Sequence, residues 1–417
     1  MKRIHHSWIQ VVLGALALNT LAIRIYTFGV FLVPIATEFG WGRGVLSGAS
    51  SVAALVGAVT NIIGGRLSDK YGPRFLVTTS GLAMIMGYIL LSQIGSLWQV
   101  YLIMGLFMPI GVSGCFFPVM STISRWFHKK RVTAIGIAMT GFALGAVIWP
   151  PITQWLISSY NWRFTFVALA LITAVVSIPV AQFMRHSPQR VGLLPYGESI
   201  ASGGEKGSSL ADMGLSPREA INTRHFWLWG PILLCFFFCL DLIMTHIVAY
   251  ALDVGIPAII AAFTLSIIAA VSIIGRLSGG SVSDWMGIRK LVSGSLVLVI
   301  LALISLLVKP GIWSFITFAL IFGLGYGFFI ILESAMSAEL FGTKSLGAIM
   351  ATLGIFGMTG TAAGRTLGGV IFDLTGSYQD AFLLCIILVV TALILSVILI
   401  RSGIPAVKPR QIQLISR

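Results

Sequence analysis

Charged and titratable side chains lie inside long apolar runs of this sequence. They are Arg24, Asp241, His246, Arg365 and Arg276, the last in the segment SIIGRLSGG. An arginine in such a run keeps its proton and needs water or an anion beside it. Its planar guanidinium can hold a carboxylate through two parallel hydrogen bonds. Arg276 therefore predicts an anion site within the apolar part of the molecule; the alternative is an arginine held by backbone carbonyls or a carboxylate for packing alone.

Asp241 and His246 are candidates for carrying a proton, because a carboxylate in an apolar environment and an imidazole can both exchange protons near neutral pH. Asp241 is also a candidate ion-pair partner of Arg276 or Arg24, and His246 could simply bond to a helix backbone. Arg24 is accordingly expected to pair with Asp241 or to form a second anion contact. For Arg365 we expect an outer-vestibule contact or an ion pair.

The elements that must position these residues are membrane helices. The chain has 417 residues, is 57% hydrophobic and 10% charged, and has a mean hydropathy of +0.98. A soluble protein of this size could not bury so much apolar surface. The four cysteines fall inside the apolar runs without metal or disulfide spacing. Twelve apolar windows of membrane-spanning length follow one another, at residues 9–36, 44–66, 75–94, 98–124, 133–158, 163–184, 226–252, 256–281, 290–308, 312–338, 345–372 and 379–400.

The formal net charge of +14 has a topological explanation. If the N-terminus is cytoplasmic, most Lys and Arg residues fall in inner loops and tails, as membrane proteins prefer. The chain is then a multi-pass protein of the inner (plasma) membrane with both termini cytoplasmic. The sequence MKRIHHSW runs directly into the first apolar window, so we expect a retained helix and no removed signal peptide. Nucleic acid is not an expected partner.

A polar, Gly/Ser-rich stretch divides the chain into two halves. Its composition predicts a cytoplasmic linker at residues 185–224 between a six-helix half at 1–184 and a second at 225–417, which ends in a short basic tail. Two segments recur in equivalent places: GGRLSDKYGPRFLV as GGSVSDWMGIRKLV, and MTGFALG as MTGTAAG. This pattern predicts two parallel structural repeats.

Both copies of the first repeat contain Gly-x-x-x-Asp-x-x-Gly-x-Arg, which resembles the cytoplasmic loop signature of the major facilitator superfamily. The resemblance implies an all-α integral membrane fold of twelve transmembrane helices in two six-helix, pseudo-symmetric halves. It also implies that the Asp braces neighbouring helices in the outward-open state and that the Arg anchors the loop. The residues concerned are Gly65, Asp69, Gly72, Arg74, Gly280, Asp284, Gly287 and Arg289.

Longer segments resemble the branch that holds the monocarboxylate transporters and the oxalate:formate exchanger. They are FLVPIATEFGW, STISRWFHKKRVTAIGIAMTGFALGAVIWPP and IIGRLSGGSVSDWMG. The resemblance implies that Arg276 contacts the substrate carboxylate. Asn61 precedes its repeat's Asp by eight residues, as Arg276 does, so we expect both to face a central cavity. Aromatic residues at family positions predict the cavity walls: Tyr26, Phe116, Phe142 and Tyr326.

Two departures from the relatives bear on the substrate. The sequence has Ser272 where animal monocarboxylate transporters have an Asp, and about Gly357 where the oxalate exchanger has a Lys. With those charges absent, a single carboxylate is the expected ligand of Arg276.

The sequence thus predicts a secondary active transporter of small monocarboxylates such as lactate or pyruvate, coupled to H⁺ by symport. The alternatives are an organic anion antiporter of the oxalate:formate kind and a transporter-like carboxylate sensor. No nucleophile elbow, P-loop or metal-spaced His/Cys cluster suggests an enzyme. The expected partners are a small carboxylate, H⁺ and the lipid bilayer, with no cofactor or metal, and the chain is expected to function as a monomer.

Overall fold

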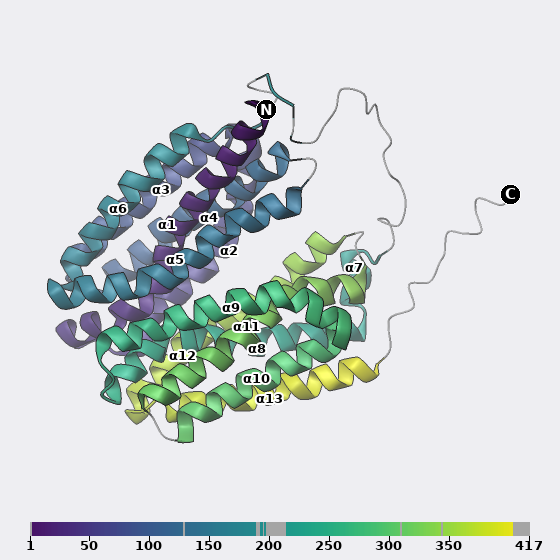
Figure 1. Ribbon diagram of the computed structural model, residues 1–417. Helices are drawn as coiled ribbons and strands as arrows, with labels where there is room; N and C mark the ends of the chain where they lie inside the picture. The colour runs from purple at the N-terminus through teal and green to yellow at the C-terminus, as the bar shows by residue number, and fades with distance from the viewer. Residues whose placement is uncertain are drawn as a thin grey trace.

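The computed structural model of the protein (Figure 1) describes residues 2–127, 130–188, 192–194, 196, 214–308, 311–342 and 345–402. Of residues 2–6, 58, 62, 65, 66, 68–70, 131 and 132 it describes the backbone alone. Most of the expected linker and the tail from residue 403 lie outside this description.

The described chain is almost entirely helical, and twelve of its helices are long and apolar enough to cross a membrane. The prediction of twelve spans is therefore confirmed. The short helix α7 (Pro217–Ile221), capped by the Ser216 side chain, was not predicted. The long helices are α1 (Lys2–Phe39), α2 (Arg43–Tyr71), α3 (Pro73–Ser92), α4 (Leu97–Trp126), α5 (Arg131–Ser159), α6 (Trp162–Phe183), α8 (Arg224–Asp253), α9 (Ala258–Met286), α10 (Ile288–Val308), α11 (Ile312–Phe341), α12 (Leu346–Thr375) and α13 (Gln379–Arg401).

The repeated loop signature forms the same turn in both halves. Gly72 separates α2 from α3 with a φ of 81°, and Gly287 separates α9 from α10 with a φ of 85°. Glycine adopts this region without the steric cost that a Cβ would bring. The glycines that the sequence repeats are therefore required by the backbone of two equivalent turns.

The second repeat marks two equivalent helix contacts. A Cβ on Gly141 of α5 would lie 2.1 Å from the Ala15 carbonyl oxygen of α1, and a Cβ on the equivalent Gly360 of α12 would lie 2.3 Å from the Leu234 carbonyl oxygen of α8. Small residues allow such close backbone approach between membrane helices. MTGFALG and MTGTAAG thus place α5 on α1 and α12 on α8 in the same way.

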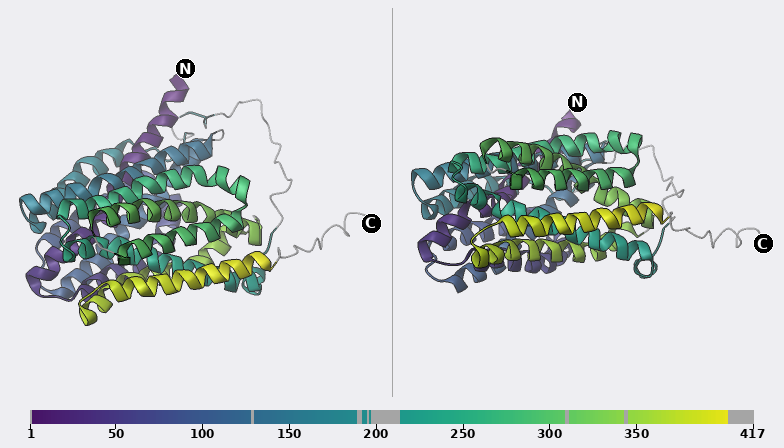
Figure 2. Two further views of the ribbon diagram at one scale, coloured as in Figure 1. Left: turned by 60° about the horizontal axis from the view of Figure 1, so that its bottom comes forward. Right: turned by 90° about the horizontal axis from the view of Figure 1, so that it is seen from below.

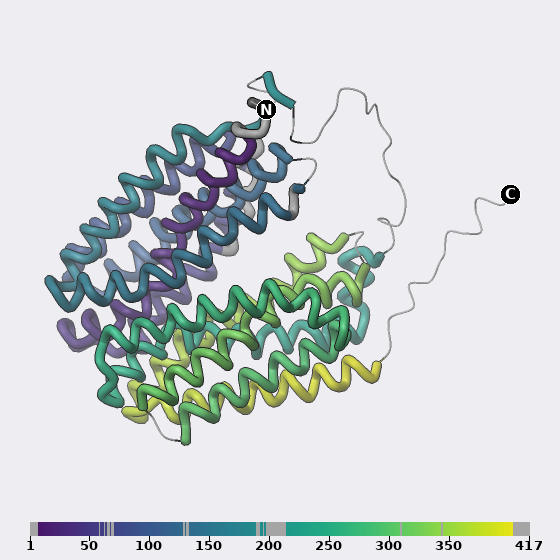
Figure 3. The backbone as a smooth tube through the Cα atoms, viewed as in Figure 1, coloured from purple at the N-terminus to yellow at the C-terminus, as the bar shows by residue number. Residues whose placement is uncertain are grey.

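The two six-helix halves form separate groups, purple to blue and teal to yellow in Figure 3. α1 begins and α13 ends at the same end of the bundle, which we call the terminal end; the other is the far end. Figure 2 shows that the long helices run alongside one another, with α13 at the rim.

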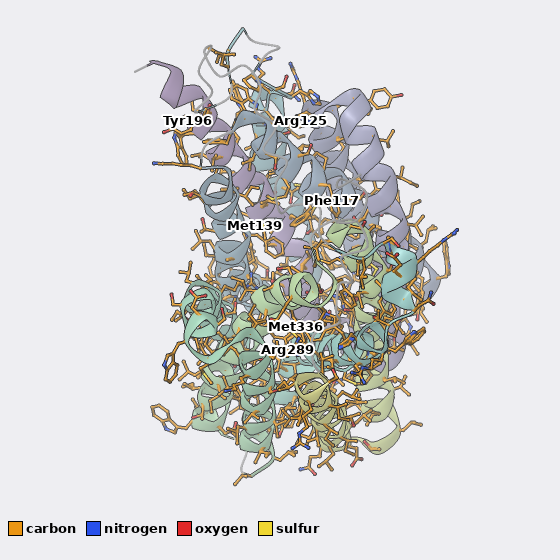
Figure 4. All side chains as sticks on the ribbon, turned by 90° about the vertical axis from the view of Figure 1, so that its right-hand side faces the viewer. Phe117, Arg125, Met139, Tyr196, Arg289 and Met336 are labelled. Atoms are coloured by element: carbon orange, nitrogen blue, oxygen red, sulfur yellow. The ribbon has the colours of Figure 1, made fainter. Side chains whose placement is uncertain are left out.

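Contacts between the halves occur towards the far end. The Ser51 hydroxyl of α2 donates to the Ala362 carbonyl of α12 at 2.7 Å, and the Ser266 hydroxyl of α9 donates to the Val147 carbonyl of α5 at 2.6 Å. At the terminal end the ribbons of the halves spread apart (Figure 1). Seen from that end in Figure 4, Arg125 belongs to one half and Arg289 to the other. The halves are thus closed together at the far end.

Candidate functional site

A cavity of about 230 Å³ lies between the halves, lined by the middle parts of long helices from both. An apolar cavity of about 150 Å³ can hold benzene, so this one has room for a small organic molecule. Its wall combines aromatic and aliphatic side chains with five charged or phenolic groups that bear on the predictions: Arg24, Tyr26, Asp241, Tyr326 and Arg365.

Asp241 and Arg365 form an ion pair in the cavity wall. Arg365 donates from Nε at 2.8 Å and from Nη2 at 2.5 Å to Asp241 Oδ1, while the Thr361 hydroxyl donates to Oδ2 at 2.6 Å. The two charged side chains are only 13% and 16% exposed. Arg365 Nη1 also donates to the Ser50 hydroxyl of α2 at 3.0 Å. The pair therefore belongs to the C-terminal half but also bonds to the N-terminal half.

This arrangement corrects one expectation. Asp241 pairs with neither Arg276 nor Arg24 in this structure. The reason is the close packing of α12 on α8 at Gly364, which brings the next residue, Arg365, against α8. The ion pair that was one alternative for Arg365 is observed.

Arg276 is held by a phenol. Its Nη2 donates to the Tyr326 hydroxyl at 2.9 Å, and its guanidinium carbon lies 5.2 Å from the centre of that ring. Its Nε is buried without a hydrogen-bond partner, and no carboxylate lies within ion-pair distance among the described residues. Gly275 and Gly327 bring α9 and α11 into backbone contact beside this pair. Arg276 is thus a cation that bonds to a cavity-lining hydroxyl and has no counter-charge within the described part of the chain.

Two of the predicted aromatic residues adjoin this arginine. Tyr26 lines the cavity and interacts electrostatically with Tyr326 and Arg276. Its ring packs edge-on against Phe142, with centroids 5.6 Å apart. The structure thus brings Tyr26, Phe142, Tyr326 and Arg276 together, but only the two tyrosines line the cavity.

Two other predicted site residues lie elsewhere. Phe116 packs against Phe117, with ring centroids 5.3 Å apart, and does not line the cavity. Asn61 is also absent from the cavity wall, but its Oδ1 is buried without a hydrogen-bond partner. Their contact with a substrate remains a prediction.

Arg24 lines the cavity from α1. Its Nε and Nη2 are buried and lack partners among the described residues. The nearby Arg365 acts on it by charge repulsion. The ion pair expected for Arg24 is therefore not formed in this structure, which leaves the anion contact as its alternative.

His246 is fully buried and does not line the cavity. Its Nε2 lies 2.8 Å from the Arg365 carbonyl oxygen, which can only accept, so Nε2 carries a hydrogen. Its Nδ1 lies 3.1 Å from the Tyr378 hydroxyl. Burial raises the pKa of Tyr378, so this hydroxyl stays protonated and can donate. The neutral imidazole thus has both of its hydrogen bonds satisfied, which favours the structural alternative for this state.

A cluster at the far end was not predicted from the sequence. Arg43, at the start of α2, donates from Nη1 at 2.5 Å and from Nη2 at 2.8 Å to the Asp253 carboxylate at the end of α8. Its guanidinium carbon lies 3.9 Å from the centre of the Phe372 ring. The backbone N–H groups of Arg43 and Gly44 donate to Asp373, both at 2.8 Å. We call Arg43, Asp253, Phe372 and Asp373 the far-end cluster; it joins the two halves.

The loop-signature residues lie at the terminal end. Arg74 donates to Gln182 Oε1 at 2.8 Å, and Arg289 donates to Glu339 Oε1 at 2.7 Å, so each arginine ties its loop to a neighbouring helix. Asp284 is exposed. Gly280 lies in α9 with no atom within 4 Å of where a Cβ would be. The side chain of Asp69 and the surroundings of Gly65 lie outside the described part of the structure.

Comparisons with known proteins agree with this geometry. The family model described as Major Facilitator Superfamily matches residues 12–308 and 280–414. Monocarboxylate transporter 13 of Bos taurus is 30% identical over 386 residues, covering 89% of this chain and 84% of the relative. Monocarboxylate transporter 12 of Mus musculus is 24% identical over 404 residues, covering 91% and 82%. A bacterial homologue of the human lysosomal transporter Spinster, solved in an inward-facing, unoccupied conformation, superimposes with a TM-score of 0.73 at 17% identity, covering 95% of this chain and 96% of the other.

Proposed function

Since the chain belongs to the major facilitator superfamily, we propose that it transports small monocarboxylates, such as lactate or pyruvate, across a membrane by alternating access between its two halves. Relatives named monocarboxylate transporters support the substrate class. The hydrogen bonds between the halves towards the far end support a carrier that is closed at that end.

The observation that carries the proposal is Arg276, a guanidinium beside the cavity without a carboxylate partner among the described residues. A substrate carboxylate that replaces its bond to Tyr326 would gain charge-assisted hydrogen bonds, which are about twice as strong as neutral ones. Tyr26 and Phe142 would then contact the apolar body of the acid. Ser272 and Gly357 add no charge at the places where relatives have one.

Proton coupling is the second part of the proposal, and Asp241 is the residue that we propose carries the proton. The carboxylate lies in the cavity wall, where a bound anion can compete with it for the hydrogens of Arg365. An Asp241 released in this way accepts a proton. Coupling of one monoanion to one proton moves no net charge across the membrane. His246 is the less favoured carrier, because both of its ring nitrogens are already bonded.

The proposed location is the inner (plasma) membrane, with both termini cytoplasmic and a monomer as the working unit. The distribution of Lys and Arg supports this orientation. The far-end cluster then faces outward, and the present conformation is closed on the outer side.

Transport by proteoliposomes tests this function. We expect an imposed inward H⁺ gradient to drive uptake of labelled lactate or pyruvate into vesicles that contain no substrate. Arg276→Gln should reduce that uptake at least tenfold, since it removes a hydrogen-bonded charge contact. The matched control is Arg163→Gln, which removes an exposed arginine paired with Glu38. Uptake that requires substrate inside the vesicles would instead establish exchange, and full activity of Arg276→Gln would reject the assigned site.

A further inference from the structure

A small recess inside the N-terminal half adjoins the central cavity. It holds about 40 Å³ and is lined by α1, α2, α3, α4 and α6. Its walls are apolar except for Arg24, Thr27 and Tyr88. The Thr27 hydroxyl donates to the Ile23 carbonyl at 2.8 Å, so it needs no further partner. Arg24 and Tyr88 are the polar groups that remain to be explained.

Both groups are buried without partners. Arg24 Nε, Arg24 Nη2 and the Tyr88 hydroxyl have no hydrogen bond within the described ranges, and Tyr88 is only 2% exposed. The two side chains interact electrostatically. A buried guanidinium without an anion is strongly unfavourable, and a buried hydroxyl without a partner adds to that cost. Together, the guanidinium N–H groups of Arg24 and the hydroxyl of Tyr88 can donate hydrogen bonds to a carboxylate.

The size of the recess limits what can enter it. One water needs about 10–15 Å³ measured in this way, so 40 Å³ accommodates roughly three heavy atoms. A carboxylate group has three heavy atoms. The recess therefore fits the end of an acid whose remainder lies in the larger cavity.

The recess and the central cavity lie next to each other, because Arg24, Phe28 and Met104 line both. Arg24 is two residues from Tyr26, or about 3 Å along the axis of α1, and Tyr26 interacts with Arg276. One arginine from each half thus lacks a carboxylate partner among the described residues: Arg24 in the wall of the cavity, and Arg276 bonded to Tyr326 of that wall.

We propose that Arg24 and Tyr88 form a second carboxylate subsite, so that the carrier also binds short dicarboxylates with one carboxylate at Arg276 and the other in the recess. The inference rests on the proposed function, in which a monocarboxylate occupies the Arg276 end alone. A dicarboxylate supplies one negative charge to each unpaired arginine and contacts both halves.

Binding of matched acids to the purified protein tests the proposal, with propionate and succinate titrated in chloride-free buffer and followed by the shift in thermal unfolding. We expect succinate to bind at least tenfold more tightly than propionate. Arg24→Gln should remove that preference by weakening succinate binding far more than propionate binding, and Tyr88→Phe should reduce the preference several-fold. Tyr160→Phe is the matched control, since it removes a hydroxyl from a tyrosine that is 60% exposed.

The possible outcomes separate the two proposals. Equal binding of both acids by the wild type, or a succinate preference that survives both Arg24→Gln and Tyr88→Phe, overturns the subsite and leaves the monocarboxylate function standing. Chloride that stabilises the wild type but not Arg24→Gln, without a succinate preference, assigns the subsite to a free inorganic anion and also overturns the inference. Failure of both acids to bind rejects the proposed function and the subsite with it.

Discussion

At the scale of single residues, Arg24 and Arg365 line one cavity, Arg276 bonds to Tyr326 of its wall, and the three arginines differ in the partners that they have. Arg365 is neutralised by Asp241, Arg276 bonds to a phenol, and Arg24 has two unpartnered nitrogens. Among these side chains three positive charges therefore accompany one negative charge. Positive clefts with apolar walls raise the local concentration of anions. This imbalance favours an organic anion as the ligand over a neutral or cationic one.

The Asp241–Arg365 pair gives a residue-scale prediction about stability. Asp241→Ala or Arg365→Ala alone should each lower the free energy of unfolding by about 3–5 kcal/mol, because each leaves an uncompensated buried charge. The double variant should lose less than the worse of the two single variants. Thermal unfolding in detergent measures all three.

The control for that prediction is the Arg163–Glu38 pair, in which both side chains are 41% exposed. Removal of either partner should cost less than about 1 kcal/mol, as for exposed ion pairs in general. If the Asp241→Ala/Arg365→Ala double variant lost as much free energy of unfolding as the two single variants lose together, Asp241 and Arg365 would not be stabilising each other.

Arg276 and Tyr26 were expected beside a central cavity, and Tyr26 lines it with Arg276 close by. That these residues contact a substrate stays a prediction, and the structure gives only their positions. The pairing of Asp241 with Arg365 was not predicted from the sequence, although both charges were recognised as lying inside apolar runs. It depends on which face of α12 meets α8, and the glycine contacts that fix this face become visible only in three dimensions.

At the scale of helices, the halves share a backbone plan but differ in chemistry. Gly145 of α5 lies against the Asn19 carbonyl of α1, as Gly364 of α12 lies against the Phe238 carbonyl of α8. The residue after Gly364 is Arg365, whereas the residue after Gly145 is Ala146. The charged pair therefore has an apolar counterpart in the first half. The repeat predicts the packing of helices but not the location of the charges.

Gly364→Ala gives an element-scale prediction. The new Cβ would lie 2.2 Å from the Phe238 carbonyl oxygen, so α12 must move away from α8 and the Asp241–Arg365 bonds must lengthen. We expect a loss of about 1–3 kcal/mol in stability, as for overpacked sites, together with reduced transport. Thermal unfolding and uptake assays measure both.

Gly354→Ala is the matched control on the same helix, because no atom lies within 4 Å of where its Cβ would be. It should be neutral, or stabilising by up to about 1 kcal/mol through helix propensity. Equal unfolding temperatures for the two variants would show that the close contact at Gly364 is unimportant.

At the scale of the whole molecule, the far-end cluster holds the halves together. Its hydrogen bonds join the start of α2 to the ends of α8 and α12. Alternating access requires these bonds to break whenever the far end opens. The Tyr378 hydroxyl accepts from Arg43 at 3.3 Å and lies 3.1 Å from His246, so the cluster also adjoins the buried network around Arg365.

Arg43→Ala should shift the carrier towards opening at the far end. A cysteine introduced by Thr366→Cys, at the α2–α12 contact, reports this opening through its rate of labelling by a water-soluble maleimide. The four native cysteines are buried, so they should contribute little background labelling by the maleimide. We expect labelling about tenfold faster, since a charged hydrogen-bonded contact contributes about 1.5–3 kcal/mol.

Arg163→Ala is the control for far-end opening, because its ion pair with Glu38 lies at the same end but within one half. It should leave the labelling rate unchanged. A rate that is the same in Arg43→Ala and wild type would show that other contacts close the far end.

The overall architecture was largely predictable from the sequence. Apolar run lengths gave the twelve spans, and the repeated motifs gave the equivalence of the halves, because both are local properties of the chain. The closure at the far end was not predictable. It depends on contacts between Arg43 and residues more than 200 positions away, such as Asp253, and on which conformation the carrier occupies.

Asp373 has a consequence for the backbone that it touches. The first N–H groups of a helix have no partner within the helix, and for α2 those of Arg43 and Gly44 are satisfied by a carboxylate from the other half. The first turn of α2 therefore has its full complement of hydrogen bonds only while the far end is shut. Opening of the far end would expose these two N–H groups to solvent, so the exchange of their hydrogens would report how often the far end opens.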